Sequence, residues 1–321
     1  MKECRVCGNI RNNQTHIACE MMFGSRDEFN YIECAVCGCL QLDNIPSDIS
    51  GYYPSDYYSL QPAFEKKSNK LAGYFKRRYA AHILGDENLI GKIYLKAHGI
   101  ERHFEWLSRA GAGLNSGILE VGCGAGKMLL KLSVFGFKNL TGIDPFIVSD
   151  IYYRNGVKVL KRTLSEADGL FSFVMLHHAF EHILDPLDAL KQLNRLMLPD
   201  GVALIRIPVA DSYSWEHYGI DWVQLDAPRH TFIHTRKSME ILADKAGFKI
   251  MDVLCDSTAF QFYGSEQYIN NIPLRDPRSY SVSAENSIFT KEQIKRFEEK
   301  AKKLNSEDRG DQACFYLRKV T

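Results

Sequence analysis

Two Cys-x-x-Cys pairs near the start of the chain are the first residues whose types and spacing indicate chemistry. They are Cys4-Arg-Val-Cys7 and Cys34-Ala-Val-Cys37, and a glycine follows each pair. A tight turn after the first cysteine, which the glycine helps to form, directs both thiolates of a pair toward one point. Two such pairs complete a tetrahedral site of four sulfur ligands, an arrangement that suits zinc. We therefore predict a zinc ribbon held by Cys4, Cys7, Cys34 and Cys37.

The predicted zinc is structural, because four protein ligands leave no open position for water or substrate. The 26 residues between the two pairs exceed the roughly 15–20 of the usual spacing, so a long hairpin must lie between them. The alternatives are disulfides or four unpaired thiols, and a reducing compartment disfavours disulfides. The nearby Cys19, Cys39 and His16 are interpreted as bystanders rather than ligands.

A glycine-rich turn directly after a predicted strand, Ile118–Val121, is the second feature. It contains Gly122, Gly124 and Gly126 and precedes a predicted helix. The third glycine of a dinucleotide-binding fingerprint would fall at Lys127, and the Gly-Lys-Ser/Thr of a P-loop is absent. The spacing therefore favours an adenosine ligand that carries no phosphate.

Asp144 ends the next predicted strand, 22 residues after Gly122. A carboxylate at this place can accept hydrogen bonds from both hydroxyls of a ribose. Together the loop and Asp144 resemble the first motif and the second-strand acid of class I S-adenosylmethionine-dependent methyltransferases. The resemblance implies an α/β, Rossmann-like sheet of seven strands and S-adenosylmethionine as the cofactor. The contacts it implies are Glu120 and Gly122 at the methionine, Gly124, Gly126 and Asp144 in the loop and at the ribose, Pro145 and Phe146 at the adenine, and His177 and His178 near the sulfonium.

Segments outside this core indicate a more specific group within these methyltransferases. Besides the cysteine pairs, the chain has a tyrosine-rich stretch over 51–58, the segment His178–Pro186 and the tail Gly310–Leu317. In these it is similar to zinc-containing methyltransferases of sugar and polysaccharide pathways, over nearly its whole length. The resemblance implies a small acceptor, a sugar or nucleotide-linked sugar, methylated on oxygen, nitrogen or carbon. Carbon-methylating members use a histidine in a Glu-His-Leu element. Here His230 matches the histidine, whereas Arg229 replaces the glutamate, which argues against carbon methylation.

Two histidines are candidates for acting on the acceptor. Methyl transfer needs an electron pair about 3–3.5 Å from the methyl group, and usually a base that removes the acceptor's proton. We predict His230 as this base, and His182 as a second candidate or a positioning group. The alternative for each is a histidine whose nitrogens are satisfied within the fold. The predicted substrate contacts are Arg77, Arg78 and Arg229 at phosphates, and Trp222, Tyr52, Tyr53, Tyr57 and Tyr58 stacking on a base or sugar; solvated or salt-bridged arginines are the alternative.

The strands must place these residues at one edge of a sheet. Apolar runs from Gly117 onward alternate with amphipathic stretches, the pattern of a parallel sheet covered by helices. The predicted strands are Ile118–Val121, Leu140–Ile143, Val157–Leu160, Phe171–Leu176, Val202–Ile207, Lys249–Leu254 and Ala313–Arg318. The predicted helices include one that Asp185 caps and 199–201 end, one over 235–246, and one from Thr290 to about Leu304. We predict three parts: a zinc ribbon at 1–50, a linker and helical cap at 51–110, and the methyltransferase domain at 111–321.

Composition restricts the classes of function. The 321 residues carry a formal charge of +1, with 45% hydrophobic and 25% charged residues, as in an ordinary soluble protein. The apolar runs fall short of the ~20 residues of a membrane span, and no signal-peptide pattern opens the chain, so we expect a cytoplasmic protein without a membrane partner. An RNA base methyltransferase is the alternative enzyme, disfavoured by the neutral charge. A noncatalytic, zinc-containing protein that binds S-adenosylmethionine is the alternative of another class.

Overall fold

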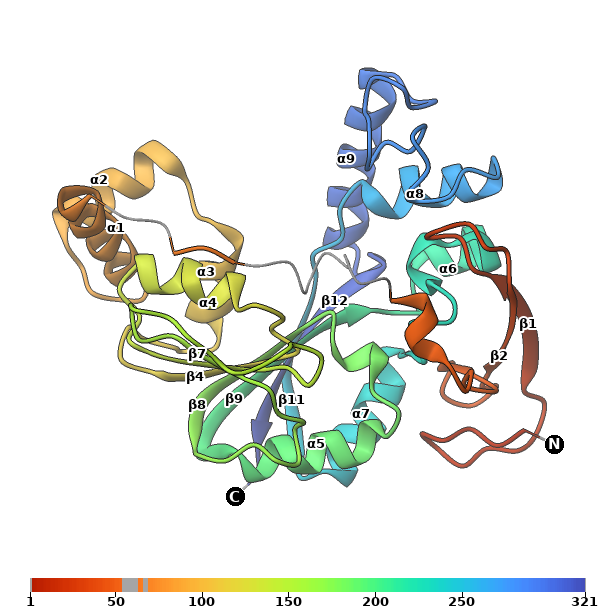
Figure 1. The fold of residues 1–321 in the computed structure, drawn as a ribbon, viewed down its shortest axis with the longest axis horizontal. Helices are drawn as coiled ribbons and strands as arrows, with labels where there is room; N and C mark the ends of the chain where they lie inside the picture. Colours follow the sequence, from red (N-terminus) through yellow and green to blue (C-terminus); the bar gives the residue numbers. More distant parts are fainter. Residues whose placement is uncertain (1, 54–62, 66–68, 321) are drawn as a thin grey trace.

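The structure, a computed structural model, describes residues 2–53, 63–65 and 69–320. Within these residues the chain forms one sheet of eight strands and one of four (Figure 1). The strands are β1 (Gln14–Cys19), β2 (Glu28–Glu33), β3 (Leu40–Leu42), β4 (Gly117–Val121), β5 (Asn139–Ile143), β6 (Ile151–Tyr152), β7 (Lys158–Leu160), β8 (Phe171–His177), β9 (Met197–Pro208), β10 (Phe232–Ile233), β11 (Phe248–Cys255) and β12 (Gln312–Lys319). The α-helices are α1 (Lys70–Ile83), α2 (Leu89–His98), α3 (Arg102–Arg109), α4 (Lys127–Val134), α5 (Pro186–Arg195), α6 (Tyr213–Tyr218), α7 (Arg236–Lys245), α8 (Phe260–Ile269) and α9 (Lys291–Ser306).

The large sheet has the order β11-β12-β9-β8-β4-β5-β7-β6. Strands β9, β8, β4, β5 and β7 run parallel, whereas β12 lies antiparallel between β9 and β11. The predicted α/β, Rossmann-like fold is therefore confirmed, but the predicted seven strands are not. Among the described residues there are eight, because the two-residue strand β6 adds an antiparallel edge beside β7. A strand of two residues is too short to show an alternating pattern in the sequence.

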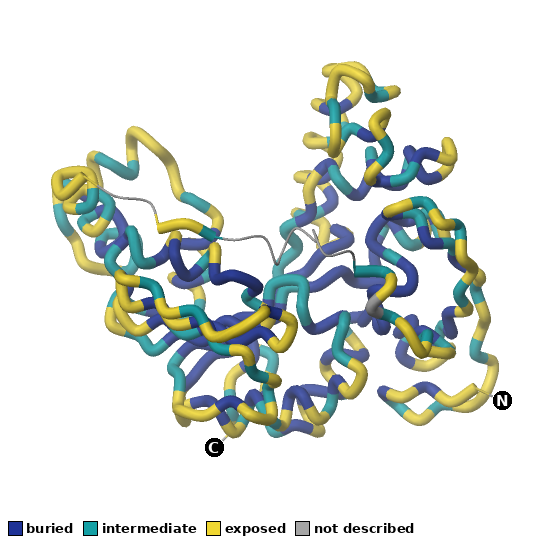
Figure 2. Tube along the Cα trace, viewed as in Figure 1, coloured by how far each residue is buried: buried dark blue, intermediate teal, exposed yellow. Residues whose placement is uncertain are grey.

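Alternating side chains fill two cores, one on each face of the large sheet. In β8, Val174 and Leu176 pack with α5 and α7, whereas Phe173 and Met175 pack with α3 and α4. This is the two-residue period expected of a strand that is buried on both faces. Figure 2 shows the buried strands between two layers of helices whose outer surfaces are exposed. The carboxyl ends of the parallel strands remain as the edge where loops gather.

The predicted helix caps are present. The Asp185 side chain accepts a hydrogen bond from the N–H of Asp188 at the start of α5, and Thr235 and Thr290 each form a capping box at α7 and α9. The first of these helices is shorter than predicted. It ends at Arg195 rather than at 199–201, and Met197 already belongs to β9. An apolar residue at helical spacing also suits a buried strand, so the pattern by itself did not locate this boundary.

The small sheet joins the N-terminal module to the rest of the chain. Its order is β1-β2-β3-β10, and β10 comes from residues that follow the predicted catalytic histidine His230. The module also contacts α7, because Thr235 Oγ1 donates to the carbonyl of Cys37 over 2.5 Å and Lys245 Nζ donates to that of Val6 over 2.8 Å. The predicted ribbon at 1–50 is thus incomplete without a strand from the predicted domain at 111–321.

The predicted helical cap consists of α1, α2 and α3. It lies over the end of the large sheet away from the N-terminal module (Figure 1). Among the described helices, no helix combines the length and the apolar character that a membrane span requires. The predicted contacts Tyr57 and Tyr58, and the first basic residues of the predicted helix, Lys66 and Lys67, lie outside the described residues.

Candidate cofactor site, histidine cluster and cysteine centre

The glycine loop forms a tight turn between β4 and α4. Gly122, Gly124 and Gly126 all have positive φ angles, of 70°, 52° and 75°, which residues with a side chain rarely adopt. A Cβ atom at Gly122 would lie 2.7 Å from the Cβ of Ala179. Asp144 orders the loop, because its carboxylate accepts hydrogen bonds from the N–H groups of Gly124 and Phe146, each over 2.8 Å. The structure therefore brings together the glycines and the acid that the sequence predicts.

Glu120 is a buried carboxyl group directly before this loop. Its Oε2 atom has no hydrogen-bond partner among the described residues. Burial, together with the charge of nearby Asp144, raises the pKa of Glu120 to about 8. A buried carboxyl without a partner is costly, and a cationic ligand would satisfy it. The ammonium and sulfonium groups of S-adenosylmethionine fit this requirement, so Glu120 suits the predicted methionine side of the site.

The remaining predicted cofactor contacts surround the same loop. Phe146 is 77% exposed beside Asp144, and Pro145 is exposed as well, so both are free to border an adenine. His177, at the end of β8, lies against Trp106 with ring centroids 4.5 Å apart, and neither of its ring nitrogens has a partner among the described residues. Burial lowers the pKa of His177 to about 3, so its ring is neutral.

We expect Asp144→Ala to weaken the binding of S-adenosylhomocysteine by at least tenfold. The change removes the acceptor of two loop N–H groups, and each carboxylate oxygen also retains a lone pair for a ribose hydroxyl. Isothermal titration calorimetry measures this affinity. Asp150→Ala, at an exposed position of the same loop region, is the matched control and should bind as the wild type does. Unchanged affinity of the Asp144 variant would contradict the assignment of the site.

A second group of side chains lies beside the glycine loop. Glu181 and His182 belong to the 3-10 helix η2 (Phe180–His182), which follows Ala179, the residue that a Cβ atom at Gly122 would contact. One ligand atom each from Glu181, His182 and His230 lies within 4.8 Å of the others. The rings of His182 and His230 have centroids 4.8 Å apart, and His230 Nε2 is 3.9 Å from Glu181 Oε1. We call these three residues the histidine cluster.

Backbone carbonyl groups determine which nitrogen of each ring carries hydrogen. His230 Nδ1 is 2.8 Å from the carbonyl oxygen of Gln224, and His182 Nδ1 is 2.8 Å from that of Arg229. A carbonyl oxygen only accepts hydrogen bonds, so both Nδ1 atoms donate, and in neutral rings the Nε2 atoms keep their lone pairs. Burial, and then the proximity of His182, lowers the pKa of His230 to about 4, which keeps its ring neutral.

His178 links the cluster to an arginine. Its Nε2 lies 2.7 Å from Arg206 Nη1 and accepts that hydrogen bond, so Nδ1 donates to Glu181 Oε1 over 3.2 Å. Glu181 is 0% exposed, and its other oxygen, Oε2, has no partner among the described residues. Burial alone would raise the pKa of Glu181, but the hydrogen bond that His178 Nδ1 donates favours the ionised carboxylate and lowers the pKa. The cluster therefore contains an ionised carboxylate and two lone pairs on nitrogen.

Two predicted substrate contacts are corrected. Arg229 is 0% exposed, and its guanidinium pairs with Asp226 over 2.7 Å and with Glu20 over 2.8 Å. Trp222 is also 0% exposed, and its ring N–H donates to Asp311 over 3.0 Å. Neither side chain is available to a phosphate or a sugar. A sequence shows that an arginine or tryptophan is present but not which side chain will cover it.

The other two predicted phosphate contacts lie on α1. Arg77 is exposed and its side chain packs over Gly136, whereas Arg78 lies 3.7 Å from Asp86. Helix α1 is at the far end of the sheet from the N-terminal module and from β10, which follows His230 (Figure 1). The structure therefore does not bring these arginines to the histidine cluster. The interpretation of Arg77 and Arg78 as phosphate contacts stays a prediction.

The acidic residues around the two histidines were not predicted from the sequence. Glu181 stands directly before His182, and its position beside two histidines is a signal that could have identified it. Asp226 pairs with Arg229 from only three positions away, whereas Glu20 carries no such signal, because it meets Arg229 across 209 positions of the chain. Tyr31 was missed for the same reason: its hydroxyl donates to the carbonyl of His230 over 2.7 Å.

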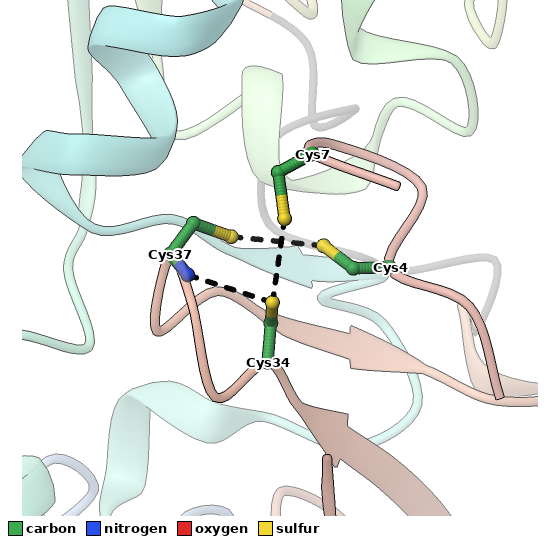
Figure 3. A group of neighbouring side chains, drawn as sticks. All are labelled: Cys4, Cys7, Cys34 and Cys37. Atoms are coloured by element: carbon green, nitrogen blue, oxygen red, sulfur yellow. Dashed lines mark hydrogen bonds between the residues drawn. The ribbon is translucent and has the colours of Figure 1, made fainter. Parts of the chain in front are cut away.

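The four predicted zinc ligands converge at the end of the N-terminal module (Figure 3). The Sγ atoms of Cys4 and Cys37 are 3.6 Å apart, those of Cys7 and Cys34 are 3.4 Å apart, and all four lie within 4.8 Å of one another. Tetrahedral zinc with bonds of about 2.3 Å separates its sulfur ligands by about 3.8 Å. The donor set therefore fits zinc. The contact between Cys4 and Cys37 lowers the pKa of Cys4 and raises that of Cys37, so it favours the thiolate at one of the two sulfurs.

Local turns explain this convergence. The N–H groups of Gly8 and Gly38 donate to the carbonyl oxygens of Cys4 and Cys34, each over 2.8 Å. Both glycines have positive φ angles, of 78° and 71°, as the predicted turns require. The bystander interpretation agrees with the geometry, because the cluster does not include the described Cys19, Cys39 or His16. All nine cysteines are described, and each is free rather than in a disulfide.

A family model described as "Methyltransferase domain" matches residues 94–253. The matched part includes the glycine loop, Asp144 and the histidine cluster, and it ends before β12; the four clustered cysteines lie outside it. This part of the chain matches a methyltransferase domain, and the match supports the prediction of an S-adenosylmethionine-dependent methyltransferase at the level of this class. The glycine loop and Asp144, which we predict to bind S-adenosylmethionine, both lie within this matched part.

Two curated relatives illustrate the range of acceptors in such domains. EEF1A lysine methyltransferase 2 of Danio rerio is 34% identical over 73 residues, which cover 22% of this chain and 30% of the relative. The ubiquinone biosynthesis O-methyltransferase of Rickettsia conorii is 31% identical over 145 residues, which cover 42% of this chain and 49% of the relative. The chain thus spans less than half the length of each of these relatives.

Solved structures with similar folds are more distant. An O-methyltransferase from a trans-AT polyketide synthase multienzyme of Brevibacillus brevis, in complex with S-adenosylhomocysteine, has a TM-score of 0.42 and 14% identity, covering 75% of this chain and 79% of that one. The cyclopropane synthase MmaA2 of Mycobacterium tuberculosis has a TM-score of 0.42 and 15% identity, covering 78% and 100%. The sheet order and the family match, rather than these overlays, define the fold.

Proposed function

We propose that this protein transfers a methyl group from S-adenosylmethionine to a sugar or nucleotide-linked sugar. One observation carries the reaction. Ala179, whose Cβ lies where a side chain at Gly122 would point, begins the turn that holds Glu181 and His182. A cofactor in the loop would therefore place its methyl group near the histidine cluster. The matched relatives include an O-methyltransferase, and oxygen is the acceptor atom that we favour.

His230 and His182 are the side chains that we propose to act on the acceptor. Both turn an Nε2 lone pair away from the backbone carbonyl that binds Nδ1, and Glu181 lies between them and His178. Groups of this kind take part in removing the proton of a hydroxyl while the methyl group is transferred. The reaction breaks the bond from sulfur to the methyl carbon and the bond from the acceptor oxygen to hydrogen, and forms a bond from oxygen to carbon.

A sugar acceptor follows from the resemblance of the whole chain, and the two phosphates of a nucleotide-linked sugar would need cations. Arg77 and Arg78 are the remaining predicted suppliers. We propose a cytoplasmic reaction, since the nine free cysteines suit a reducing compartment.

The acceptor class is tested by supplying the protein with labelled S-adenosylmethionine and a cytosolic extract. The expected label is in a small phosphorylated metabolite that a pyrophosphatase splits into a nucleotide and a methylated sugar phosphate. Label in a nuclease-sensitive polymer would replace the sugar acceptor by RNA. No transfer to any fraction, from an extract that supports a known sugar methyltransferase, would favour a noncatalytic protein that binds the cofactor.

We further propose that the four clustered cysteines hold one structural zinc ion. Zinc would join the two turns and thereby support β3, the partner of β10. Protein purified without chelator should contain about one zinc per chain, and Cys34→Ser should lose it and unfold at a lower temperature, because structural zinc contributes directly to folding. Cys19→Ser, which lies outside the cluster, is the control. Wild-type protein without zinc would contradict this prediction.

A further inference from the structure

One ring nitrogen each of His182 and His230 and a carboxylate oxygen of Glu181 lie within 4.8 Å of one another. Each Nδ1 is committed to a backbone carbonyl, so each neutral ring offers only a lone pair at Nε2. His230 Nε2 faces Glu181 Oε1 at 3.9 Å, and Glu181 Oε2 is buried with no partner among the described residues. Three acceptors that face one another repel unless a positive charge lies among them.

The charged groups around the cluster also lack positive charge. Glu20, Glu181 and Asp226 supply three carboxylates, and Arg229 is the guanidinium that pairs with two of them. Three of these four residues are fully or almost fully buried, and the Asp226 side chain is 9% exposed. His178 donates to Glu181 from a neutral ring, since its Nε2 accepts from an arginine. The formal charge of the four groups is therefore two units negative.

We propose that Glu181, His182 and His230 bind a divalent transition-metal ion. Two imidazole nitrogens and one carboxylate are a common ligand set for such ions, and they leave coordination positions open. The backbone carbonyls that accept from both Nδ1 atoms are the outer partners that metal-binding histidines normally have. The ligand atoms lie within 4.8 Å of one another, and binding would have to draw them to the ~2.0–2.2 Å of metal bonds around one ion.

This inference rests on the proposed function and specifies how the histidine cluster would act. An acceptor oxygen can occupy an open position of the ion, and the ion lowers the pKa of the bound hydroxyl. The proton then leaves to water while its electron pair stays on the oxygen that receives the methyl group. His182 and His230 take part as ligands, and the ion offsets the two negative charges.

The test measures the number of metal ions bound per chain in the full-length protein. The protein is incubated with Mn²⁺, freed of unbound ion, and its zinc and manganese are measured together by mass spectrometry, so that an ion already present is included. The wild type should hold one more ion per chain than either Glu181→Gln or His182→Gln. His217→Gln, at an exposed histidine on α6, should hold as many ions as the wild type. S-adenosylhomocysteine binding tests whether each variant is folded. The His182 variant serves as the second test if the Glu181 variant does not fold, because His182 is only half-buried.

Equal metal contents in the wild type and a folded variant would overturn the proposal. Methyl transfer measured on the same samples separates it from the proposed function. Suppose that methyl transfer is observed but that the wild type and the variants have the same metal content. The metal site is then contradicted, the methyltransferase function stands, and His230 remains the candidate base. A difference of one ion without transfer to any acceptor would retain the metal site and contradict the proposed function.

Discussion

Replacing His230 by asparagine is expected to lower the turnover number by about 10²–10⁴-fold, the range that a group removing the acceptor's proton contributes. Asparagine lacks the Nε2 atom that faces Glu181 at 3.9 Å, so the cluster loses one of its two imidazoles. Its amide can still donate to the carbonyl of Gln224, as Nδ1 of the histidine does over 2.8 Å. The loop should therefore keep its conformation while the chemistry is lost. Single-turnover kinetics with labelled S-adenosylmethionine measure the effect.

Two controls separate this result from a general loss of structure. S-adenosylhomocysteine affinity should not change, because the glycine loop and Asp144 are ordered by their own hydrogen bonds. His217→Asn, at an exposed position on α6, should turn over at the wild-type rate. A His230 variant that retains a rate within threefold of the wild type would remove this residue from the catalytic machinery and leave His182 as the candidate.

Glu20→Ala is expected to lower the free energy of unfolding by about 3–5 kcal/mol, the cost of breaking a buried ion pair by removing one partner. Glu20 lies 1% exposed in the N-terminal module and pairs with the fully buried Arg229 over 2.8 Å. It also accepts the N–H of Gly24 over 2.8 Å, so the hairpin loop loses a support as well. Urea unfolding measures the change. Turnover should fall too, since Arg229 directly precedes His230.

A surface ion pair provides the matched control. Glu216 lies within salt-bridge distance of Arg309, but both side chains are largely exposed. Glu216→Ala should therefore change the free energy of unfolding by less than about 1 kcal/mol. If Glu20→Ala has an equally small effect, the module does not support the loop through Arg229. A Glu20→Gln variant, which keeps the side-chain length, should be less destabilised than Glu20→Ala if the pair acts partly through its packing.

Local patterns were sufficient to predict the parts of the site that are continuous in the chain. The loop at Gly122, Gly124 and Gly126 needs positive φ angles, and glycine shows this in the sequence. Asp144 follows its strand at the edge where parallel strands end, so its meeting with the loop follows from strand order. The cysteine turns are equally local, because each glycine binds the carbonyl of the first cysteine in its pair.

Long-range contacts were not predictable in the same way. The strand pairing of β10 with β3 joins residues almost 200 positions apart, and two-residue strands carry no pattern. From the sequence, Arg229 was predicted as a cation available to a substrate, but in the structure it pairs with Glu20 and Asp226. Trp222 was predicted as a stacking surface, but it is buried and its ring N–H donates to Asp311. Burial depends on which segments cover a side chain, and this information is not local.

The sequence by itself therefore indicated the methyltransferase class, the glycine loop with Asp144 as the predicted cofactor site, the four clustered cysteines and the two histidines. Their signals are backbone geometry and short spacing, which a few neighbouring residues specify. Only the tertiary structure decided that Glu181 completes the histidine cluster, that the N-terminal module shares a sheet with the segment after His230, and that Arg229 supports this segment instead of a substrate. Each of these depends on charges and hydrogen bonds that become strong when distant segments exclude water together.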